Sequence, residues 1–488
     1  MRIRLAAAAA LSTIFAFAAA GTAGAQTQNC TYPASAYSTG APWDVTAPGA
    51  QPVSDPVFPD QWGLQQINAP AAWQRGDSGS GATIAILDTG VDLAHPDLQS
   101  KLVAGADVTE SDFQGCPGPQ DENGHGSHVA GIAAAATNNG IGVAGTAPAA
   151  QIMPVRVLNA DGEGSDAEVI AGIKHAADNG AEVINLSLGG QPVIGQLPPL
   201  NAEMAAAVDY AFSKGSLVVA AAGNESVPLC SYPAAAAKAI CVGATDRRGA
   251  PSAYSNFPAS PEDNVRVRAP GGFGPLDCEF SENIWSTVWP EGDECRNTTR
   301  GDLSGYDAFA GTSMASPFVA GVAALLSAKG LSNAQILECI RTTSSNKGAY
   351  DPAMGYGIVD ADAATQTCSA ASTPAFGGSG APQGGGSADF LTVTAKRRSR
   401  ARLVRTRRIP VTIRSSKAVR VKLRAVMRKS GARPRRIGRR TVRLTGAGRK
   451  RTVLRLSRRG ARRLKRSRKA ALQVRYRGGG HRGVASWR

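Results

Sequence analysis

Short apolar segments alternate with helical patterns through most of the chain before residue 370. Between the apolar segments, residues 167–179 and 202–214 carry the periodicity of helices. The apolar segments lack a regular alternation with polar residues, which is typical of parallel strands covered on both faces; they are 82–87, 152–157, 183–186 and 217–221. The pattern predicts an α/β fold, in which an open, mostly parallel sheet has helices on both faces. Functional residues are then expected at the carboxyl ends of the strands.

Polar residues follow two of these apolar segments closely. Asp88 ends the first segment, where a carboxylate can be buried and still held in one orientation. Asp92 is a competing candidate, but it lies further from the strand end and is expected to serve the loop. Asn224 follows the fourth segment and places a neutral amide at another strand end, although alone it would be an ordinary turn residue.

Two histidines occur in the glycine-rich stretch Asn123-Gly-His-Gly-Ser-His-Val-Ala-Gly131. Glycines on both sides of His125 permit other segments of the chain to approach it closely. His128 lies one turn into the following small-residue helix and is expected to be structural. His125 is therefore the candidate for chemistry.

A helix start is predicted at Gly311-Thr-Ser-Met-Ala-Ser-Pro317, which precedes the apolar residues 318–326. Such a helix is too apolar for a surface position, so its N-terminus is expected to be buried. A hydroxyl on Ser313 would lie near unpaired backbone N–H groups and the positive end of the helix dipole, which suits an atom beside which negative charge develops. The simpler interpretation is that Thr312 or Ser313 only caps the helix.

The order of Asp88, His125 and Ser313 along the chain, with Asn224 before the serine, resembles that of the subtilisin-like serine proteases. Within this family, residues 55–147 resemble the thermitase-like members most. Five segments within residues 55–364 carry the resemblance: Ala85-Ile-Leu-Asp-Thr-Gly90, Gly124-His-Gly-Ser-His-Val-Ala-Gly131, Ser187-Leu-Gly-Gly190, Ala221-Ala-Gly-Asn224 and Gly311-Thr-Ser-Met-Ala-Ser-Pro317. The resemblance implies a serine endopeptidase with Ser313 as nucleophile, His125 as general base and Asp88 as the carboxylate that orients the imidazole. It also implies an oxyanion hole formed by the Asn224 side chain and the Ser313 backbone N–H.

The same resemblance implies that an extended peptide substrate pairs with edge strands. The implied substrate-binding residues lie along two edges and the primary pocket: they are Gly162, Gly164, Ser187, Leu188, Gly189, Ala222 and Gly223. Ser231 stands where the family usually has glycine before Tyr-Pro. We therefore expect a narrowed pocket that does not favour the largest aromatic side chains.

A structural calcium site is also implied by the resemblance, whereas no catalytic metal is expected. Residues 136–143 are similar to a loop that wraps Ca²⁺ in the family, with Asn139 as a ligand and Asp55 and Asp97 completing the site. Hard oxygen ligands of this kind suit Ca²⁺. The alternative is an ordinary Asn-Gly turn.

The first 25 residues predict a secretory signal peptide, because Arg2 and Arg4 precede an apolar stretch and Ala23-Gly-Ala25 provides a cleavage site. No transmembrane span is expected, and the protein is predicted to be secreted, either extracellular or associated with the cell surface. Residues 26–54 form a short extension before the protease domain at 55–368. This extension is too short for the folded inhibitory prodomain common in the family. Either activation needs no such domain, or the extension, held by Cys30, wraps around the body.

All eight cysteines follow the signal peptide, and an exported chain favours disulfides. Sequence proximity favours pairing Cys230 with Cys241, Cys278 with Cys295 and Cys339 with Cys368, which leaves Cys30 for Cys116. Metal binding by these cysteines is a weaker interpretation, because none has the close spacing of a zinc site.

The net charge of +17 is unevenly distributed, because an acidic part of the chain precedes a strongly basic part. Residues 391–488 hold 37 of the 54 Lys and Arg and no Asp or Glu, which leaves 17 basic against 37 acidic residues before them, a net charge of −20. Residues 369–390, rich in Gly, Ser, Ala and Pro, predict a flexible linker. Alternating apolar and basic residues after it predict a small basic β-sandwich, with a disordered basic arm as the alternative.

Two function classes follow from these features. The first is a secreted endopeptidase, expected to be a monomer, whose basic domain binds anionic cell-surface polymers. The second is a polyanion-binding protein whose protease-like body is inactive. Specific nucleic-acid recognition is not expected in either class, because beyond Phe390 only Tyr476 and Trp487 are aromatic.

Overall fold

The computed structural model describes two compact units, Met1–Ser379 and Gly380–Arg488. In the first unit it describes residues 2–4, 36–37, 53–109, 116–189, 199–256, 264–274, 281–290 and 305–376. In the second it describes residues 391–395, 406–415, 419–428, 435–444, 448–457, 471–478, 481–484 and 486–487.

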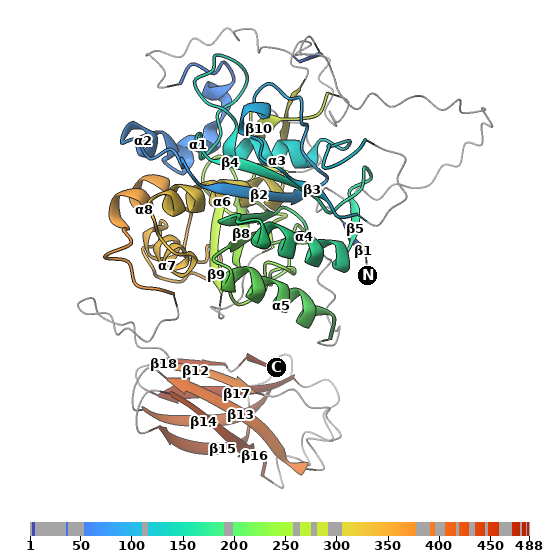
Figure 1. Cartoon of the computed structure of the whole chain (residues 1–488). Coiled ribbons are helices and arrows are strands. Elements are labelled where there is room, and N and C mark those ends of the chain that lie inside the picture. Colours follow the sequence, from blue (N-terminus) through green and yellow to red (C-terminus); the bar gives the residue numbers. More distant parts are fainter. Residues whose placement is uncertain are drawn as a thin grey trace, which may run out of the picture. The chain divides into compact units, whose positions relative to one another are not determined.

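A seven-stranded sheet forms the centre of the first unit (Figure 1), and all its strand pairs are parallel. In spatial order the strands are β3 (Ala106–Asp107), β4 (Gln151–Arg156), β2 (Thr83–Asp88), β6 (Val183–Leu186), β7 (Leu217–Ala221), β8 (Ile240–Thr245) and β9 (Val265–Pro270). The chain runs from β2 first to β4 on one side and then to β6 on the other. Such a reversal opens a crevice at the carboxyl ends of the strands, which is where ligands bind in sheets of this kind.

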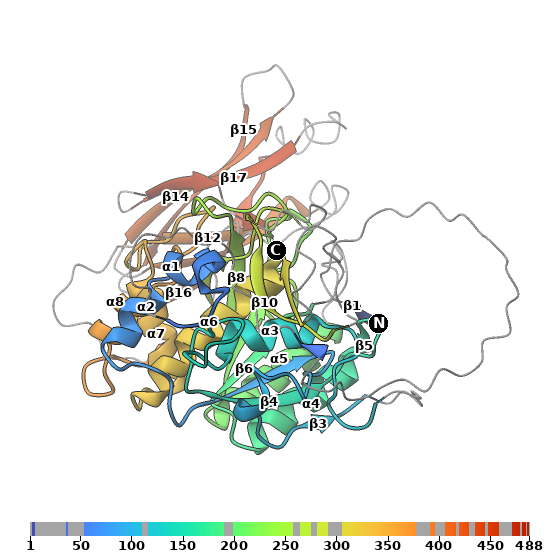
Figure 2. The ribbon, with the colours of Figure 1, turned by 90° about the horizontal axis from the view of Figure 1, so that it is seen from above.

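Helices cover both faces of this sheet. The eight described α-helices are α1 (Trp62–Gln66), α2 (Ala69–Gln74), α3 (His125–Ala134), α4 (Asp166–Asp178), α5 (Pro199–Ser213), α6 (Thr312–Ala328), α7 (Asn333–Thr343) and α8 (Ala361–Thr367). Helices α4 and α5 lie side by side, whereas α2, α7 and α8 gather at one end of the body (Figures 1 and 2). Alternate sheet residues enter two separate cores: Ile84 and Ile86 join α3 and α6, and Ala85 and Leu87 join α4 and α5. The predicted α/β fold with helices on both faces is confirmed.

The strands predicted from the apolar pattern agree with the structure to within one residue. Strands β8 and β9 were not predicted, nor was the antiparallel pair β10 (Ile284–Thr287) and β11 (Tyr306–Phe309). Strand β9 has arginines at alternate positions, which indicates a half-exposed strand by sequence, yet every residue in it is buried. Arg268 is accommodated because its guanidinium donates to the carbonyl oxygens of Ala353 and Ala244 at 2.7 and 2.8 Å.

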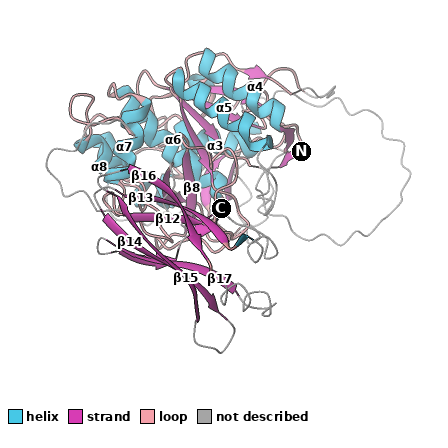
Figure 3. Ribbon diagram, turned by 90° about the horizontal axis from the view of Figure 1, so that it is seen from below, coloured by secondary structure: helices cyan, strands magenta, loops and turns pink. Residues whose placement is uncertain are grey.

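The second unit consists of strands in its described part (Figure 3), and the predicted all-β C-terminal region is confirmed. One sheet has the order β16 (Gly448–Arg455), β13 (Arg408–Ser415), β12 (Leu391–Ala395) and β19 (Ser486–Trp487). The other has the order β15 (Arg435–Leu444), β14 (Val419–Arg428), β17 (Ala471–Gly478) and β18 (His481–Val484). Along β14, buried Val421, Leu423 and Ala425 alternate with exposed Arg420 and Lys422, the pattern that predicted a half-buried strand.

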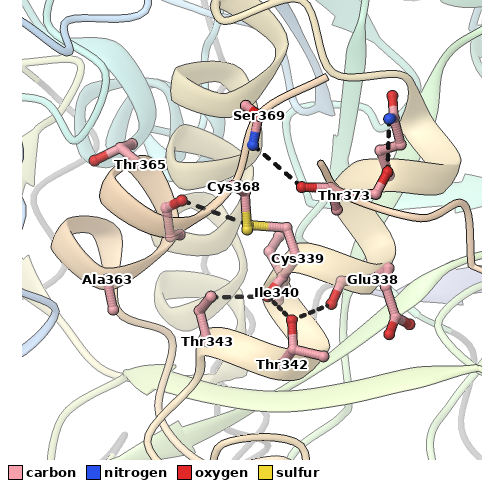
Figure 4. Close-up of a disulfide and its surroundings, with 12 residues drawn as sticks. Glu338, Cys339, Ile340, Thr342, Thr343, Ala363, Thr365, Cys368, Ser369 and Thr373 are labelled. Atoms are coloured by element: carbon pink, nitrogen blue, oxygen red, sulfur yellow. Dashed lines mark hydrogen bonds between the residues drawn. A yellow bond between two sulfur atoms is a disulfide. The ribbon is translucent and has the colours of Figure 1, made fainter. Parts of the chain in front are cut away.

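Disulfides join Cys230 to Cys241 and Cys339 to Cys368, as predicted. Cys116 is also disulfide-bonded, whereas Cys30, Cys278 and Cys295 lie outside the described residues. The Cys339–Cys368 bond ties α7 to the end of α8 (Figure 4).

The chain stays attached to the protease body after Cys368. Ser369 N donates to Thr373 Oγ1 (Figure 4), and Phe376 N donates to the carbonyl oxygen of Ala334 at 2.8 Å. Residues 369–376, which were predicted to begin the flexible linker, are thus packed against α7. The remainder of the predicted linker, 377–390, lies outside the described residues.

No helix in the described part of the chain is both long enough and apolar enough to cross a membrane. A short strand, β1 (Arg2–Arg4), occurs within the predicted signal peptide and pairs antiparallel with β5 (Glu163–Ser165) in a separate two-stranded sheet.

Candidate active site

Asp88 and His125 are joined by a hydrogen bond at the carboxyl end of β2. Asp88 is the last residue of this strand and is fully buried, and its Oδ1 lies 2.7 Å from His125 Nδ1. Thr89 N donates to the same carboxylate oxygen at 2.8 Å, so the carboxylate cannot easily turn. A carboxylate beside Nδ1 keeps the proton on that nitrogen and makes Nε2 the basic atom of the ring.

Asp121, which the sequence analysis did not identify, holds the N-terminus of α3 where His125 begins the helix. Its Oδ1 accepts from Gly124 N at 3.0 Å and from Thr89 Oγ1 at 2.8 Å. Its Oδ2 accepts from the backbone N and the hydroxyl of Ser127 at 2.8 and 2.7 Å. Asp121 therefore connects the residue that follows Asp88 to the helix that carries His125. An acidic residue just before a helix start is the only sequence signal for this role.

Gly126 permits the close packing of α3 on the loop after β2. A β-carbon at this position would lie only 2.0 Å from the carbonyl oxygen of Gly90, a separation no atom pair can adopt. Any other residue would push the helix, and His125 with it, away from Asp88.

Ser313 is the second residue of α6, and its hydroxyl donates to the carbonyl oxygen of Ser187 at 3.0 Å. In return, the Ser187 hydroxyl donates to the carbonyl oxygen of Ser313 at 2.7 Å. That carbonyl would normally accept from the N–H four residues later, but this residue is Pro317, which has none. Pro317 is the sixth residue of α6 and lies beyond the first turn, so its missing N–H removes an intrahelical partner, which the Ser187 hydroxyl replaces.

A buried polar chain extends this contact into the sheet. Asn185 Nδ2 donates to Ser187 Oγ at 3.0 Å, and Ser316 Oγ donates to Asn185 Oδ1 at 2.7 Å. All three side chains are fully buried. Because Ser313 and Ser316, at the two ends of this series of hydrogen bonds, both belong to α6, the start of this helix is fixed to the carboxyl end of β6.

Two hydrogen-bond donors meet next to Gly311, the residue before α6. Asn224 Oδ1 accepts from Thr312 N at 3.0 Å and from Thr312 Oγ1 at 2.9 Å, which leaves the Asn224 amide nitrogen to point elsewhere. A β-carbon on Gly311 would lie 3.5 Å from that nitrogen and 3.6 Å from Ser313 N. The side-chain amide and the backbone N–H of Ser313 therefore share one side of Gly311, as the two donors of an oxyanion hole must.

These features can be compared with known proteins. A family model described as the Subtilase family matches residues 79–357. The chain belongs to the subtilase family. It is 44% identical to thermitase of Thermoactinomyces vulgaris over 301 residues, which cover 61% of this chain and 94% of thermitase. It is 41% identical to subtilisin BL of Lederbergia lenta over 307 residues, which cover 62% of this chain and 98% of the relative.

A solved structure described as proteases from Pseudoalteromonas arctica PAMC 21717 matches with a TM-score of 0.55 and 32% identity, covering 65% of this chain and 99% of that one. The predicted family is confirmed, and the protein is a serine endopeptidase of the subtilisin-like type. Of the first function class, the endopeptidase activity is confirmed.

In this subtilase, the residues predicted to line the primary pocket come together around Ser231. A β-carbon on Gly223 would lie 2.6 Å from Ser231 Oγ and 2.7 Å from Glu225 Oε2, and one on Gly189 would lie 3.2 Å from Ser231 Cβ. Ala222 is adjacent, with its carbonyl oxygen accepting from Ser231 N at 2.9 Å. The Leu188 side chain is instead buried in the core with α4 and α5, so only its backbone is placed for contact with a peptide.

Asn256 organises the loop that carries Gly223 to Glu225, and the sequence analysis did not identify it. Its side chain is fully buried, and its Nδ2 donates to the Ala222 carbonyl at 3.0 Å and to Glu225 Oε2 at 2.6 Å. Its Oδ1 accepts from Glu225 N at 3.0 Å. These bonds hold the Glu225 carboxylate beside the pocket.

The other predicted edge of the subtilase is the strand β5 (Glu163–Ser165), with Gly162 in the turn before it. A β-carbon on Gly164 would lie 2.4 Å from the carbonyl oxygen of Val157, so this position packs against the chain behind it. The strand β1 pairs antiparallel with β5, with Ile3 opposite Gly164. The edge of β5 is thus able to accept an extended segment.

The residues predicted to hold calcium also come together. Asp55 accepts from the backbone N–H groups of Asn138 and Asn139 at 2.8 and 3.0 Å. Asp97 accepts from Asn139 Nδ2 at 2.7 Å and from Tyr306 Oη at 2.9 Å. Burial raises the pKa of both carboxyl groups, that of Asp97 to about 6. No cluster of three His, Cys, Asp or Glu able to hold a metal occurs among the residues the structure describes.

Proposed function

We propose that this subtilase cleaves peptide bonds through Asp88, His125 and Ser313. Ser313 Oγ attacks the carbonyl carbon of the scissile bond while its proton passes to His125 Nε2. The imidazolium then gives that proton to the leaving amine, the C–N bond breaks, and an acyl-enzyme remains. Water, deprotonated by the same imidazole, releases the acid product and restores the serine. The observation that supports this best is the 2.7 Å contact between Asp88 and His125, which orients the imidazole and stabilises its protonated form.

Ser313 must exchange one hydrogen bond before it can act. Its hydroxyl donates to the Ser187 carbonyl, and rotation about the Cα–Cβ bond would redirect the proton to His125. The reciprocal bond from Ser187 to the Ser313 carbonyl is unaffected by this rotation, because it involves the backbone. The nucleophile can thus change partners while the helix turn that carries it stays in place.

The tetrahedral intermediate would place its oxyanion between Asn224 Nδ2 and Ser313 N. Both donors face the space beside Gly311, and Thr312 fixes the amide so that nitrogen, not oxygen, is presented. Preorganised donors of this kind stabilise developing charge without reorganising during the reaction.

An extended peptide would bind along β5, with Gly162 and Gly164 on one side and Ser187, Leu188 and Gly189 on the other. Main-chain hydrogen bonds would supply affinity, and side-chain pockets would supply specificity. Gly189, Ala222 and Gly223 would line the primary pocket. The Ser231 hydroxyl and the Glu225 carboxylate at that pocket give it a polar and negatively charged character unsuited to large aromatic side chains.

Asp55, Asp97 and Asn139 would hold a structural calcium ion. The donor set fits Ca²⁺, because two buried carboxylates and an amide oxygen are hard ligands that can be joined by backbone carbonyls of the 136–143 loop. The raised pKa values support this, since burial disfavours the charged form of both carboxyl groups, and the charge of Asp55 adds to this effect at Asp97. The ion's role would be to neutralise this charge and fix the loop.

The basic unit would anchor the secreted enzyme to anionic polymers at the cell surface. On β14 and β15, Arg420 lies opposite Arg443 and Lys422 opposite Thr441, all four with exposed side chains. Like charges directly opposite each other destabilise a sheet. A bound polyanion would relieve this repulsion and release counterions, so binding should depend strongly on salt.

The experiment that tests the catalytic proposal is hydrolysis of casein by the purified protein. A serine-directed acylating inhibitor should abolish it, and Ser313→Ala should reduce it to background. Full activity in Ser313→Ala would reject the assignment of the nucleophile.

A further inference from the structure

Tyr37 belongs to the short N-terminal extension, and it is inserted into the protease body. Only 5% of the residue is exposed. Its hydroxyl donates to Asp92 Oδ2 at 2.6 Å, and its ring meets the His95 ring edge-on with centroids 5.0 Å apart. The ring also lies against Gly305, where a β-carbon would be 2.8 Å from Tyr37 Cδ1. An aromatic residue buried with its hydroxyl satisfied is an anchor in a fitted site.

The contacts of Tyr37 with Asp92 and His95 fall on the loop that joins the proposed catalytic and calcium sites. This loop, residues 89–97, begins directly after Asp88 and ends at Asp97. Asp92 N donates to Ser127 Oγ at 2.8 Å, and that hydroxyl donates to Asp121 Oδ2 at 2.7 Å. Asp121 in turn holds the N-terminus of the His125 helix, so a continuous path of hydrogen bonds links Tyr37 to that helix.

A second path leads from Tyr37 towards Asp97. The His95 ring also meets the Tyr306 ring edge-on, with centroids 5.1 Å apart. His95 Nε2 lies 2.8 Å from the carbonyl oxygen of Gly305, and Tyr306 Oη donates to Asp97. Removal of the Tyr37 ring would leave a cavity next to His95 and loosen the edge-on contact between His95 and Tyr306.

Asp92 needs a donor such as Tyr37 in this position. Its side chain is almost fully buried, and burial raises the pKa of the carboxyl group while the hydrogen bond from Tyr37 opposes that rise. Gln120 Nε2, at 3.3 Å, and Ala94 N, at 3.1 Å, also donate to this carboxylate, and both contact Oδ1. The Tyr37 hydroxyl instead donates to Oδ2, and its removal would leave a buried acceptor poorly satisfied.

We propose that the segment carrying Tyr37 is a permanent part of the working enzyme, in which Tyr37 is a positioning residue for the loop 89–97, and is not a propeptide released on activation. The effect on catalysis rests on the proposed roles of Asp88 and His125. By holding Asp92, Tyr37 limits movement of the segment between Asp88 and the start of α3. Released propeptides must dissociate, whereas this side chain is enclosed by the residues that position the active site.

The first test is to determine the N-terminus of the active, secreted enzyme by intact mass and terminal sequencing. We expect a chain that begins before Tyr37, close to Gln26. An enzyme of full specific activity that begins after Tyr37 would overturn the proposal. This measurement does not depend on which serine is the nucleophile, so its outcome is separate from that of the catalytic proposal.

The second test compares Tyr37→Phe and Tyr37→Ala with a matched control, Tyr210→Phe. Tyr210 Oη also donates to a carboxylate, Asp178 Oδ1 at 2.5 Å, but does so at the surface. We expect Tyr37→Ala to lower kcat about tenfold with KM changed less than about twofold, because misplacement of catalytic groups affects the chemical step. Tyr37→Phe should have a smaller effect in the same direction, and Tyr210→Phe none.

Thermal unfolding is measured on the same substitutions in a Ser313→Ala background, where self-cleavage by the proposed nucleophile is removed. Both Tyr37 variants should unfold at lower temperature than the parent. An unchanged kcat in folded Tyr37→Phe and Tyr37→Ala would overturn the positioning role, even if the unfolding temperature fell. If Tyr37→Ala does not fold, the kcat of Tyr37→Phe, which keeps the ring, decides the positioning role.

Discussion

Asn224 Oδ1 accepts two hydrogen bonds from Thr312, one from the backbone N–H and one from the hydroxyl. These bonds decide which end of the amide faces Gly311. Thr312 Oγ1 also accepts from Gly223 N at 3.1 Å, so the hydroxyl itself is held in one orientation. The arrangement presents the Asn224 amide nitrogen at the position proposed for the oxyanion.

We expect Asn224→Ala to lower kcat by about 10²–10³ with little change in KM, a magnitude measured for the equivalent donor of subtilisin and transferred here to a relative. The amide contacts the oxyanion only in the transition state, so ground-state binding should be preserved. Steady-state kinetics on a peptide substrate measure both constants, with Asn179→Ala on the exposed end of α4 as the control. A rise in KM with unchanged kcat would show that Asn224 binds substrate instead.

Ser231 is expected to limit the size of the side chain that enters the primary pocket. Ser231→Gly removes a hydroxymethyl group that lies against both Gly189 and Gly223. It should raise kcat/KM about tenfold for peptides with Phe before the scissile bond and leave kcat/KM for those with Ala nearly unchanged. The reason is that kcat/KM rises by about tenfold or more for each additional methylene of the substrate that a pocket accommodates. Equal changes for the Phe and Ala peptides would place Ser231 outside the pocket.

Calcium removal should destabilise the folded enzyme. A ligand at a hundred times its dissociation constant stabilises the state that binds it by about 2.7 kcal/mol. We therefore expect a chelator to shorten the half-life of thermal inactivation, and Asp97→Asn to make the enzyme insensitive to added calcium. Asp209→Asn, at an exposed surface ion pair, should respond like the parent. Unchanged thermal inactivation after chelation would exclude a structural calcium site.

Retention on anionic cell-wall preparations should depend on the exposed cations of β14 and β15. Removing one cation that binds a phosphate should reduce the slope of log affinity against log salt concentration by about one. The full chain carrying Arg420→Gln, Lys422→Gln and Arg443→Gln should therefore show a slope smaller by about three. Lys238→Gln on the protease body, made in the same chain, is the control. Salt-independent retention, or a slope unchanged by the triple substitution, would contradict an electrostatic anchor.

The four residues proposed for catalysis could be predicted because each lies in a local pattern. Asp88 ends an apolar strand, Asn224 closely follows another, His125 is flanked by glycines, and Ser313 lies at the start of an apolar helix. That these four residues act together could be predicted only from the order of the motifs and from their resemblance to a family. Parallel strands bring such residues to one edge, and this topology could be inferred from the apolar pattern.

Residues that act through long-range contacts left no comparable signal. Asn256 is defined by backbone groups of Ala222 and Glu225 that only the fold brings near it, and the contact of Asp121 with Thr89 is long-range in the same way. The partnership of Ser187 with Ser313 depends on Pro317, whose missing N–H leaves a carbonyl available to a hydroxyl 126 positions away in sequence. The burial of Arg268 in β9 was equally hard to predict, because it donates to Ala353 O, Ala244 O and Ser255 Oγ, groups that only the fold brings near it.

The assignment of Ser313 as the nucleophile is tested most directly by covalent labelling of the full-length enzyme with a serine-directed acylating inhibitor. Labelling is followed by mass-spectrometric mapping and by peptidase assays of Ser313→Ala and of Ser327→Ala, near the far end of α6. We predict one label per molecule on Ser313, loss of both label and activity in Ser313→Ala, and retention of both in Ser327→Ala. Labelling at another residue, or peptide hydrolysis that survives in Ser313→Ala, would contradict the account.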